Sequence, residues 1–107
     1  MTAGIIMGNI RAMHLVSLVI DPASVAANTT AEQTFTLNGA ATYHLPVVMK
    51  PTATAGLGIV GARISAANTL AITFSNNTAS PIDAGSETYV IFLVSPESGV
   101  ASTKIGS

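Results

Sequence analysis

Charged residues are scarce in this sequence. Lys and Arg together number 4 and Asp and Glu number 5, so 8% of the 107 residues are charged and the formal net charge is -1. An ordinary globular domain carries about 25%. Intrinsic disorder requires high charge and low hydrophobicity, whereas 49% of this chain is hydrophobic, so we expect a folded domain. So few cations cannot neutralise many phosphates, and we therefore expect no nucleic-acid partner.

Cysteine and tryptophan are absent altogether. Without cysteine the chain has no disulfide framework, no thiolate nucleophile and no thiolate zinc site. Without tryptophan, and with 2 tyrosines, it has few of the large exposed aromatic rings on which sugars stack. Both absences remove common classes of site and leave a function based on aliphatic and small polar side chains.

Long apolar runs are absent too. A helix needs about 18 consecutive apolar residues to cross a membrane, and the longest run here, residues 15–20, ends at Asp21 and Pro22. Arg11 before the run and the small residues 24–26 after it weakly resemble the positive charge and the cleavage site of a secretory signal peptide. The run is shorter than the roughly 7–15 apolar residues of such signals. We therefore expect a strand at this position and no membrane partner.

Short strand-like segments separated by turn residues make up most of the chain. Period-two alternation and β-branched runs predict strands at residues 14–20, 33–37, 43–50, 59–65, 70–75 and 88–94. The last segment is apolar on both faces, which indicates a central strand, and Pro46 indicates an edge strand or a bulge. No segment reads as a helix. We predict an all-β fold, a small β-sandwich or jelly-roll-like domain of about six to eight strands.

Two turns are predicted to close hairpins. Asn38-Gly39 is the strongest short hairpin signal in the chain, and residues 66–69 connect two strand-like segments directly. The predicted organisation is an extended N-terminal arm at 1–12, a β-sandwich domain at 13–95 and a C-terminal tail at 96–107.

Residues 56–61 match the dinucleotide-binding pattern G-x-G-x-x-G. That pattern binds a cofactor only where a strand precedes it and a helix follows it. Here a Thr- and Ala-rich loop precedes it and a β-branched segment follows. We therefore interpret Gly56 and Gly58 as positions of positive φ or of close approach to a neighbouring chain, and we expect no nucleotide cofactor.

The residues that could support catalysis or metal binding are few and dispersed. His14 and His44 are the only histidines, too few for a structural zinc site. Asp83 and Glu87 would form a paired acid site only if folding brought them together, and no G-x-S-x-G elbow is present. We therefore expect no enzyme activity, no small-molecule substrate, and no catalytic, metal-binding or cofactor-binding residues.

The N-terminal segment is apolar without a clear period. Either it packs on its own domain as an edge strand or it reaches a neighbouring subunit. The low charge favours a surface covered by neighbours, because net charge near zero promotes association. The candidate partner-contact residues are Ile5, Ile6, Met7, Ile10, Gly56 and Gly58.

The chain from Leu15 to Val94 resembles a family of small structural proteins of tailed bacteriophages. The resemblance lies in residues 21–26, 31–39, 50–51, 55–65, 68–74 and 87–91. These residues carry the pattern of a fold and no catalytic signature. The chain departs from the family between residues 42 and 46, where His44 and Pro46 stand in place of a polar turn with Gly or Asp.

The resemblance implies a non-enzymatic virion protein of the capsid decoration, or cement, type. It would lie on the capsid exterior and contact the major capsid protein and copies of itself, which we expect to form a homotrimer. Two alternatives stay open: a structural protein associated with the tail or a fibre, and a module that binds a host surface or a glycan.

Overall fold

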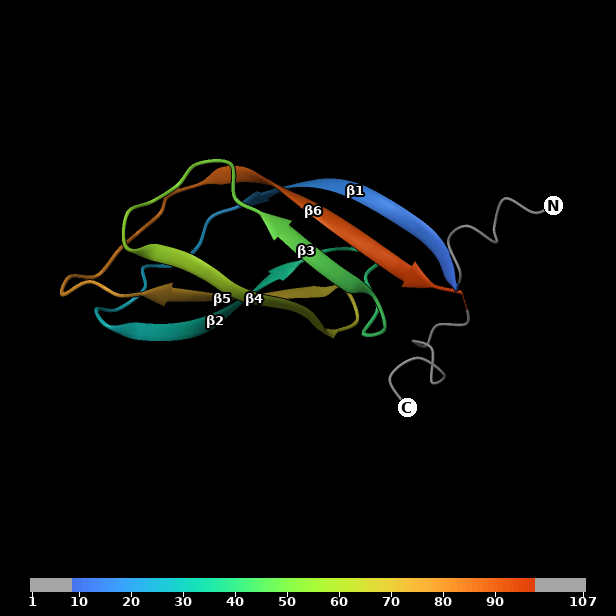
Figure 1. The fold of residues 1–107 in the computed structure, drawn as a ribbon, viewed down its shortest axis with the longest axis horizontal. Coiled ribbons are helices and arrows are strands. Elements are labelled where there is room, and N and C mark those ends of the chain that lie inside the picture. The colour runs from blue at the N-terminus through green and yellow to red at the C-terminus, as the bar shows by residue number, and fades with distance from the viewer. Residues whose placement is uncertain (1–8, 98–107) are drawn as a thin grey trace.

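The computed structural model describes residues 9–97, which form two antiparallel sheets stacked face to face (Figure 1). One three-stranded sheet has the order β1-β6-β3 and the other β2-β5-β4. The strands are β1 (Ile10–Ile20), β2 (Thr29–Thr36), β3 (Leu45–Met49), β4 (Leu57–Ala66), β5 (Thr69–Asn76) and β6 (Glu87–Pro96). The described residues contain no helix, and hence none long and apolar enough to cross a membrane. The predicted all-β, sandwich-like fold is confirmed.

Each predicted strand segment overlaps one observed strand, because the period-two pattern that predicts a strand is local. Strand β6 pairs with β1 on one side and with β3 on the other, as expected for a segment that is apolar on both faces. Pro46 lies in β3, which is an edge strand, and an edge strand tolerates a residue that has no N–H to donate.

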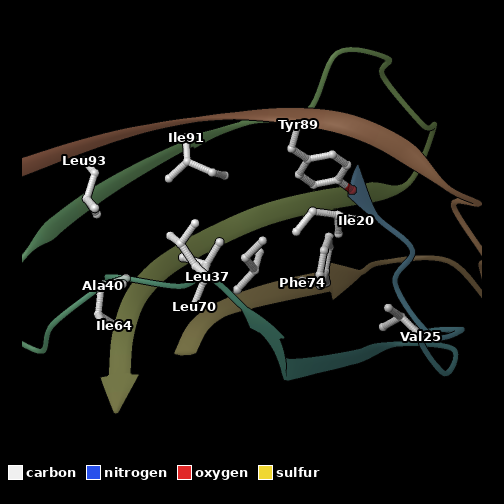
Figure 2. Packing of buried hydrophobic residues seen from close by; sticks show 11 residues of the cluster. Ile20, Val25, Leu37, Ala40, Ile64, Leu70, Phe74, Tyr89, Ile91 and Leu93 are labelled. Atoms are coloured by element: carbon white, nitrogen blue, oxygen red, sulfur yellow. The ribbon is translucent and has the colours of Figure 1, made fainter. Parts of the chain in front are cut away.

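The core lies between the two sheets, where the central strands β5 and β6 face each other. Figure 2 shows Tyr89 and Ile91 of β6 directed towards Leu70 and Phe74 of β5, and these four residues are fully buried. Burying one such side chain stabilises the fold by about 1.5–3 kcal/mol. Val25, from the loop after β1, covers one end of the core.

The hydroxyl group of Tyr89 is buried in this core. It has no hydrogen-bond partner within residues 9–97. Burial, together with the negative charge of Glu87, raises the pKa of Tyr89. The ring therefore contributes as an apolar group, and its hydroxyl stays protonated.

The hairpin predicted at residues 66–69 is confirmed. Strands β4 and β5 pair with each other, and the turn between them is closed by Asn68 at φ 61. Asparagine tolerates this left-handed conformation better than most residues.

The hairpin predicted at Asn38-Gly39 is wrong. Strand β2 pairs with β5, and β3 pairs with β6, so the chain crosses from one sheet to the other after β2. A type I′ hairpin turn needs positive φ at both central residues, and here Gly39 has it (φ 92) whereas Asn38 does not.

Contacts with the β4–β5 turn direct this crossover. The N–H of Gly39 donates to Oδ1 of Asn68 at 2.7 Å. The N–H of Leu37 donates to the Asn68 carbonyl at 2.9 Å, and the N–H of Asn68 donates to the Ala40 carbonyl at 2.8 Å. Leu37 and Ala40 are buried in the core cluster. The segment is therefore fixed by a distant turn and does not fold back on its own strand.

Candidate interaction surface

The outer face of the sheet β1–β6–β3 is apolar. Strand β6 directs Tyr89, Ile91 and Leu93 into the core, so the alternate residues of β6 face outward. The pairing of β6 with β1 and β3 sets these outward residues in three rows across the sheet: Met13–Val94–Leu45, Leu15–Phe92–Val47 and Ser17–Val90–Met49. We call these residues, with Val19 beyond them on β1, the apolar face. Ser17 is the one polar residue among them, and the polar Thr88 of β6 lies opposite Val19 at the end of this face.

The side chains of the apolar face are strongly exposed at its two edge strands. Leu15 is 77% exposed, Leu45 is 62% and Val47 is 56%. Soluble monomers rarely expose a continuous apolar patch of more than a few hundred Å² unless it has a function. The arrangement can bury aliphatic surface against another protein, and it offers no reactive group.

The outer face of the sheet β2–β5–β4 is mostly polar. Val60 of β4, 63% exposed, is the one strongly exposed large apolar residue in the strands of this sheet. Strand β2 alternates Ala31, Gln33 and Phe35, which are half-buried, with four exposed residues, Thr30, Glu32, Thr34 and Thr36. On this face Glu32 forms a two-pronged ion pair with Arg63 of β4, both N···O distances being 2.9 Å. The ion pair lowers the pKa of Glu32. The apolar face is therefore a local feature of one sheet, not a general property of the surface.

A second ion pair lies where β3 ends and β6 begins. The Nζ of Lys50 is 2.7 Å from Oε1 of Glu87, and the two side chains are 11% and 19% exposed. Lys50 also donates to the Thr52 carbonyl and to Oγ1 of Thr54. Hydrogen bonds from Lys50 and Thr52 lower the pKa of Glu87. Because Lys50 contacts both Glu87 and the loop residues Thr52 and Thr54, the pair fastens the loop after β3 to β6.

The other candidate groups are placed apart from this pair. Oδ1 of Asp83 accepts the N–H of Gly85, while Glu87 binds Lys50, so these two carboxylates do not form a pair. His14 and His44 line one hollow, and Nδ1 of His44 accepts the N–H of Ala41 at 2.9 Å. Burial, followed by the nearby His14 and Arg11, lowers the pKa of His44. Within residues 9–97 no three His, Asp or Glu side chains gather as a metal site would require.

The partner-contact residues expected from the sequence are placed as follows. Ile5, Ile6 and Met7 lie outside the described residues. Ile10 begins β1 opposite Pro96, and it lines a hollow with Leu45 at one end of the apolar face.

The two glycines expected at the interface occupy different environments. Gly56 has the positive φ expected of it, at 82°. A Cβ on Gly56 would lie 2.2 Å from Cγ2 of Thr78, so the close approach is to this chain's own loop. Gly58 lies in β4, and a Cβ there would meet nothing within 4 Å.

Sequence reasoning missed the residues of the apolar face as a site. The signal was present in β3, where Leu45, Val47 and Met49 are apolar at the outward positions and Val48 is apolar at an inward one. It was also present in β6, which is apolar at both parities. Apolar residues at both parities are typical of a central strand, so this pattern alone does not indicate an exposed apolar face.

Comparison with protein-family models, with curated proteins and with solved structures finds no match to this chain.

Proposed function

We propose that this chain is a non-enzymatic structural protein of a tailed-phage virion that decorates and stabilises the capsid exterior. In this proposal the apolar face docks on the major capsid protein. The observation that carries the proposal is the contrast between the two outer faces of one sandwich, one aliphatic and one covered by Thr and an ion pair. The resemblance of residues 15–94 to phage structural proteins is the reason for proposing a virion as the assembly.

The energetics suit a repeated contact on a lattice. Burying the exposed part of one aliphatic side chain that is about half exposed contributes roughly 1 kcal/mol. The six edge-strand residues of the face whose side chains are at least half exposed are Met13, Leu15, Val19, Leu45, Val47 and Met49. A protein that binds the assembled shell and not its separated parts stabilises the shell by mass action.

The test uses Val47→Lys on the apolar face, with Thr34→Lys on the polar face as the matched control. Both positions are exposed in edge strands, so each variant should fold. Val47→Lys places a charge in the contact, and we expect its affinity for emptied capsids to fall at least tenfold. Thr34→Lys should bind as the unmodified chain does. Co-sedimentation with capsids and the melting temperature of the decorated shell measure the effect.

Two results would overturn the proposal. One is equal binding of both variants, since the apolar face would then not be the contact. The other is no binding of the unmodified chain to capsids. In that case retention on purified tails would favour a tail component, and retention on a defined glycan would favour a host-surface module.

A further inference from the structure

Three of the four sheet edges carry devices that block further strand pairing. Strand β3 is 5 residues long and contains Pro46, and β4 has irregularities at Ile59/Gly61 and Ile64/Ala66. On β2, the side-chain amide of Gln33 exchanges two hydrogen bonds with the backbone of Ala23, at 2.8 and 2.9 Å. Short strands, proline, bulges and covering loops are the usual protections of an edge.

The edge of β1 has no such protection over most of its length. It is 11 residues long and pairs with β6 on one side. Among residues 9–97 no backbone hydrogen bond reaches its other side. Residues 12–20 include no Lys, Arg, Asp, Glu or Pro, and the one irregularity lies at the start, between Ile10 and Ala12. A long, uncharged edge of this kind is a template for another strand.

Opposite charges mark the two ends of this edge. Arg11 lies at its start and Asp21 directly follows its end, and both residues are exposed. The two ion pairs within residues 9–97 use other residues, and Nη2 of Arg11 donates to the carbonyl of Glu97 at 3.3 Å. Ten residues of strand separate Arg11 from Asp21 by roughly 33 Å, so the two cannot pair within one chain.

We propose that the β1 edge binds the β1 edge of a second copy of this chain, antiparallel and about a two-fold axis at Val16. In this register Arg11 of each copy meets Asp21 of the other, and Val16 meets its own counterpart. Residues that face each other then have the same parity, so the apolar faces of both copies lie on one side of a continuous six-stranded sheet. The pairing makes one larger apolar surface from two smaller ones. It does not depend on what that surface binds.

Cysteine cross-linking tests the register, because the chain has no cysteine of its own. In the proposed pair the two Val16 Cα atoms are about 4.5–5.5 Å apart, within the range that a disulfide spans. The two Val19 residues are offset by about 20 Å. Val19 is 67% exposed and Val16 only partly so, so random collisions would cross-link V19C more readily. We expect V16C to form a disulfide-linked dimer at least ten times faster than V19C under mild oxidation, and equal or reversed rates would overturn the proposal.

Charge exchange provides a second test that leaves the core untouched. R11E and D21R should each raise the dissociation constant of the dimer about tenfold, because each places like charges at both ends of the paired edge. The double variant R11E/D21R should return to within about threefold of the unmodified chain. Sedimentation at low ionic strength, where exposed charges act most strongly, measures these constants.

The mass of the unmodified chain in the same experiment is also decisive. We expect twice the 10.8 kDa of a single chain, and hence a dimer in place of the homotrimer that the resemblance implies. A monomer at every concentration, or a trimer, would overturn the pairing, as would a double variant that stays as weak as the single ones. None of these outcomes depends on capsid binding, so failure here is distinct from failure of the proposed function.

Discussion

Gly56 lies where a side chain would collide with a neighbouring loop. Its φ is 82°, and an added Cβ would be 2.2 Å from Cγ2 of Thr78. We expect Gly56→Ala to lower the free energy of unfolding by about 2 kcal/mol, through backbone strain and this contact. Gly58→Ala is the matched control, because a Cβ there meets nothing within 4 Å and the position lies in a strand. Urea unfolding measures both variants, and equal losses would refute the explanation.

The sequence predicted part of this glycine's role. A Thr- and Ala-rich loop that enters a β-branched segment indicated positive φ, because glycine adopts that conformation without steric penalty. The residue that approaches Gly56 could not be predicted, because it belongs to a loop that follows β5. That loop is held by the hydrogen bond from the N–H of Asn77 to the Gly56 carbonyl, at 3.0 Å. Contacts between segments distant in sequence leave no periodic signal.

At the scale of the element, strands were predictable and one of their connections was not. Each strand follows from its own period-two pattern, as in Leu70, Ile72 and Phe74 of β5. The pair Asn38-Gly39 favours a hairpin locally, but burial of Leu37 and Ala40 and the contacts with Asn68 outweigh that preference. The apolar face was likewise hidden, since only the strand order brings β1, β6 and β3 together.

Asn68 should therefore contribute more to stability than Asn38, although Asn38 carries the stronger sequence signal. Asn68→Ala loses both the residue suited to φ 61 and the acceptor for the N–H of Gly39, and we expect a loss of about 2 kcal/mol. Asn68→Gly keeps the turn conformation and should lose about 1 kcal/mol. Asn38→Ala should change the free energy of unfolding by less than about 0.5 kcal/mol. A larger loss for Asn38→Ala than for Asn68→Ala in urea unfolding would contradict this account of the crossover.

At the scale of the whole molecule, the few charged residues are unevenly distributed over the surface. Both ion pairs of the described residues lie away from the apolar face, one on the polar sheet and one at the junction of β3 and β6. The sequence showed that charge was scarce and predicted a covered surface. The strand register identifies the surface that lacks charge, because it decides which apolar residues face outward together.

The two ion pairs, together with His44, predict how stability depends on pH. Hydrogen bonds from Arg63 and Lys50 lower the pKa values of Glu32 and Glu87 below the usual 4.5. Their contribution is therefore complete above about pH 4.5 and is lost as the pH falls through the lowered values. Burial lowers the pKa of His44 below the usual 6.5. On acidification the unfolded chain therefore protonates His44 before the folded chain does, and the free energy of unfolding decreases by a small amount below about pH 6.5.

We expect the midpoint of urea unfolding to decline in two steps on acidification, a small one below about pH 6.5 and a larger one below about pH 4.5. Glu32→Gln combined with Glu87→Gln should remove the lower step and leave the upper one, while His44→Gln should do the reverse. The double Gln variant also loses two ion pairs and will be less stable at pH 7. The slope with pH, not the stability at one pH, is therefore the measurement that decides. An unchanged slope below pH 4.5 in the double variant would show that other carboxyl groups govern acid unfolding.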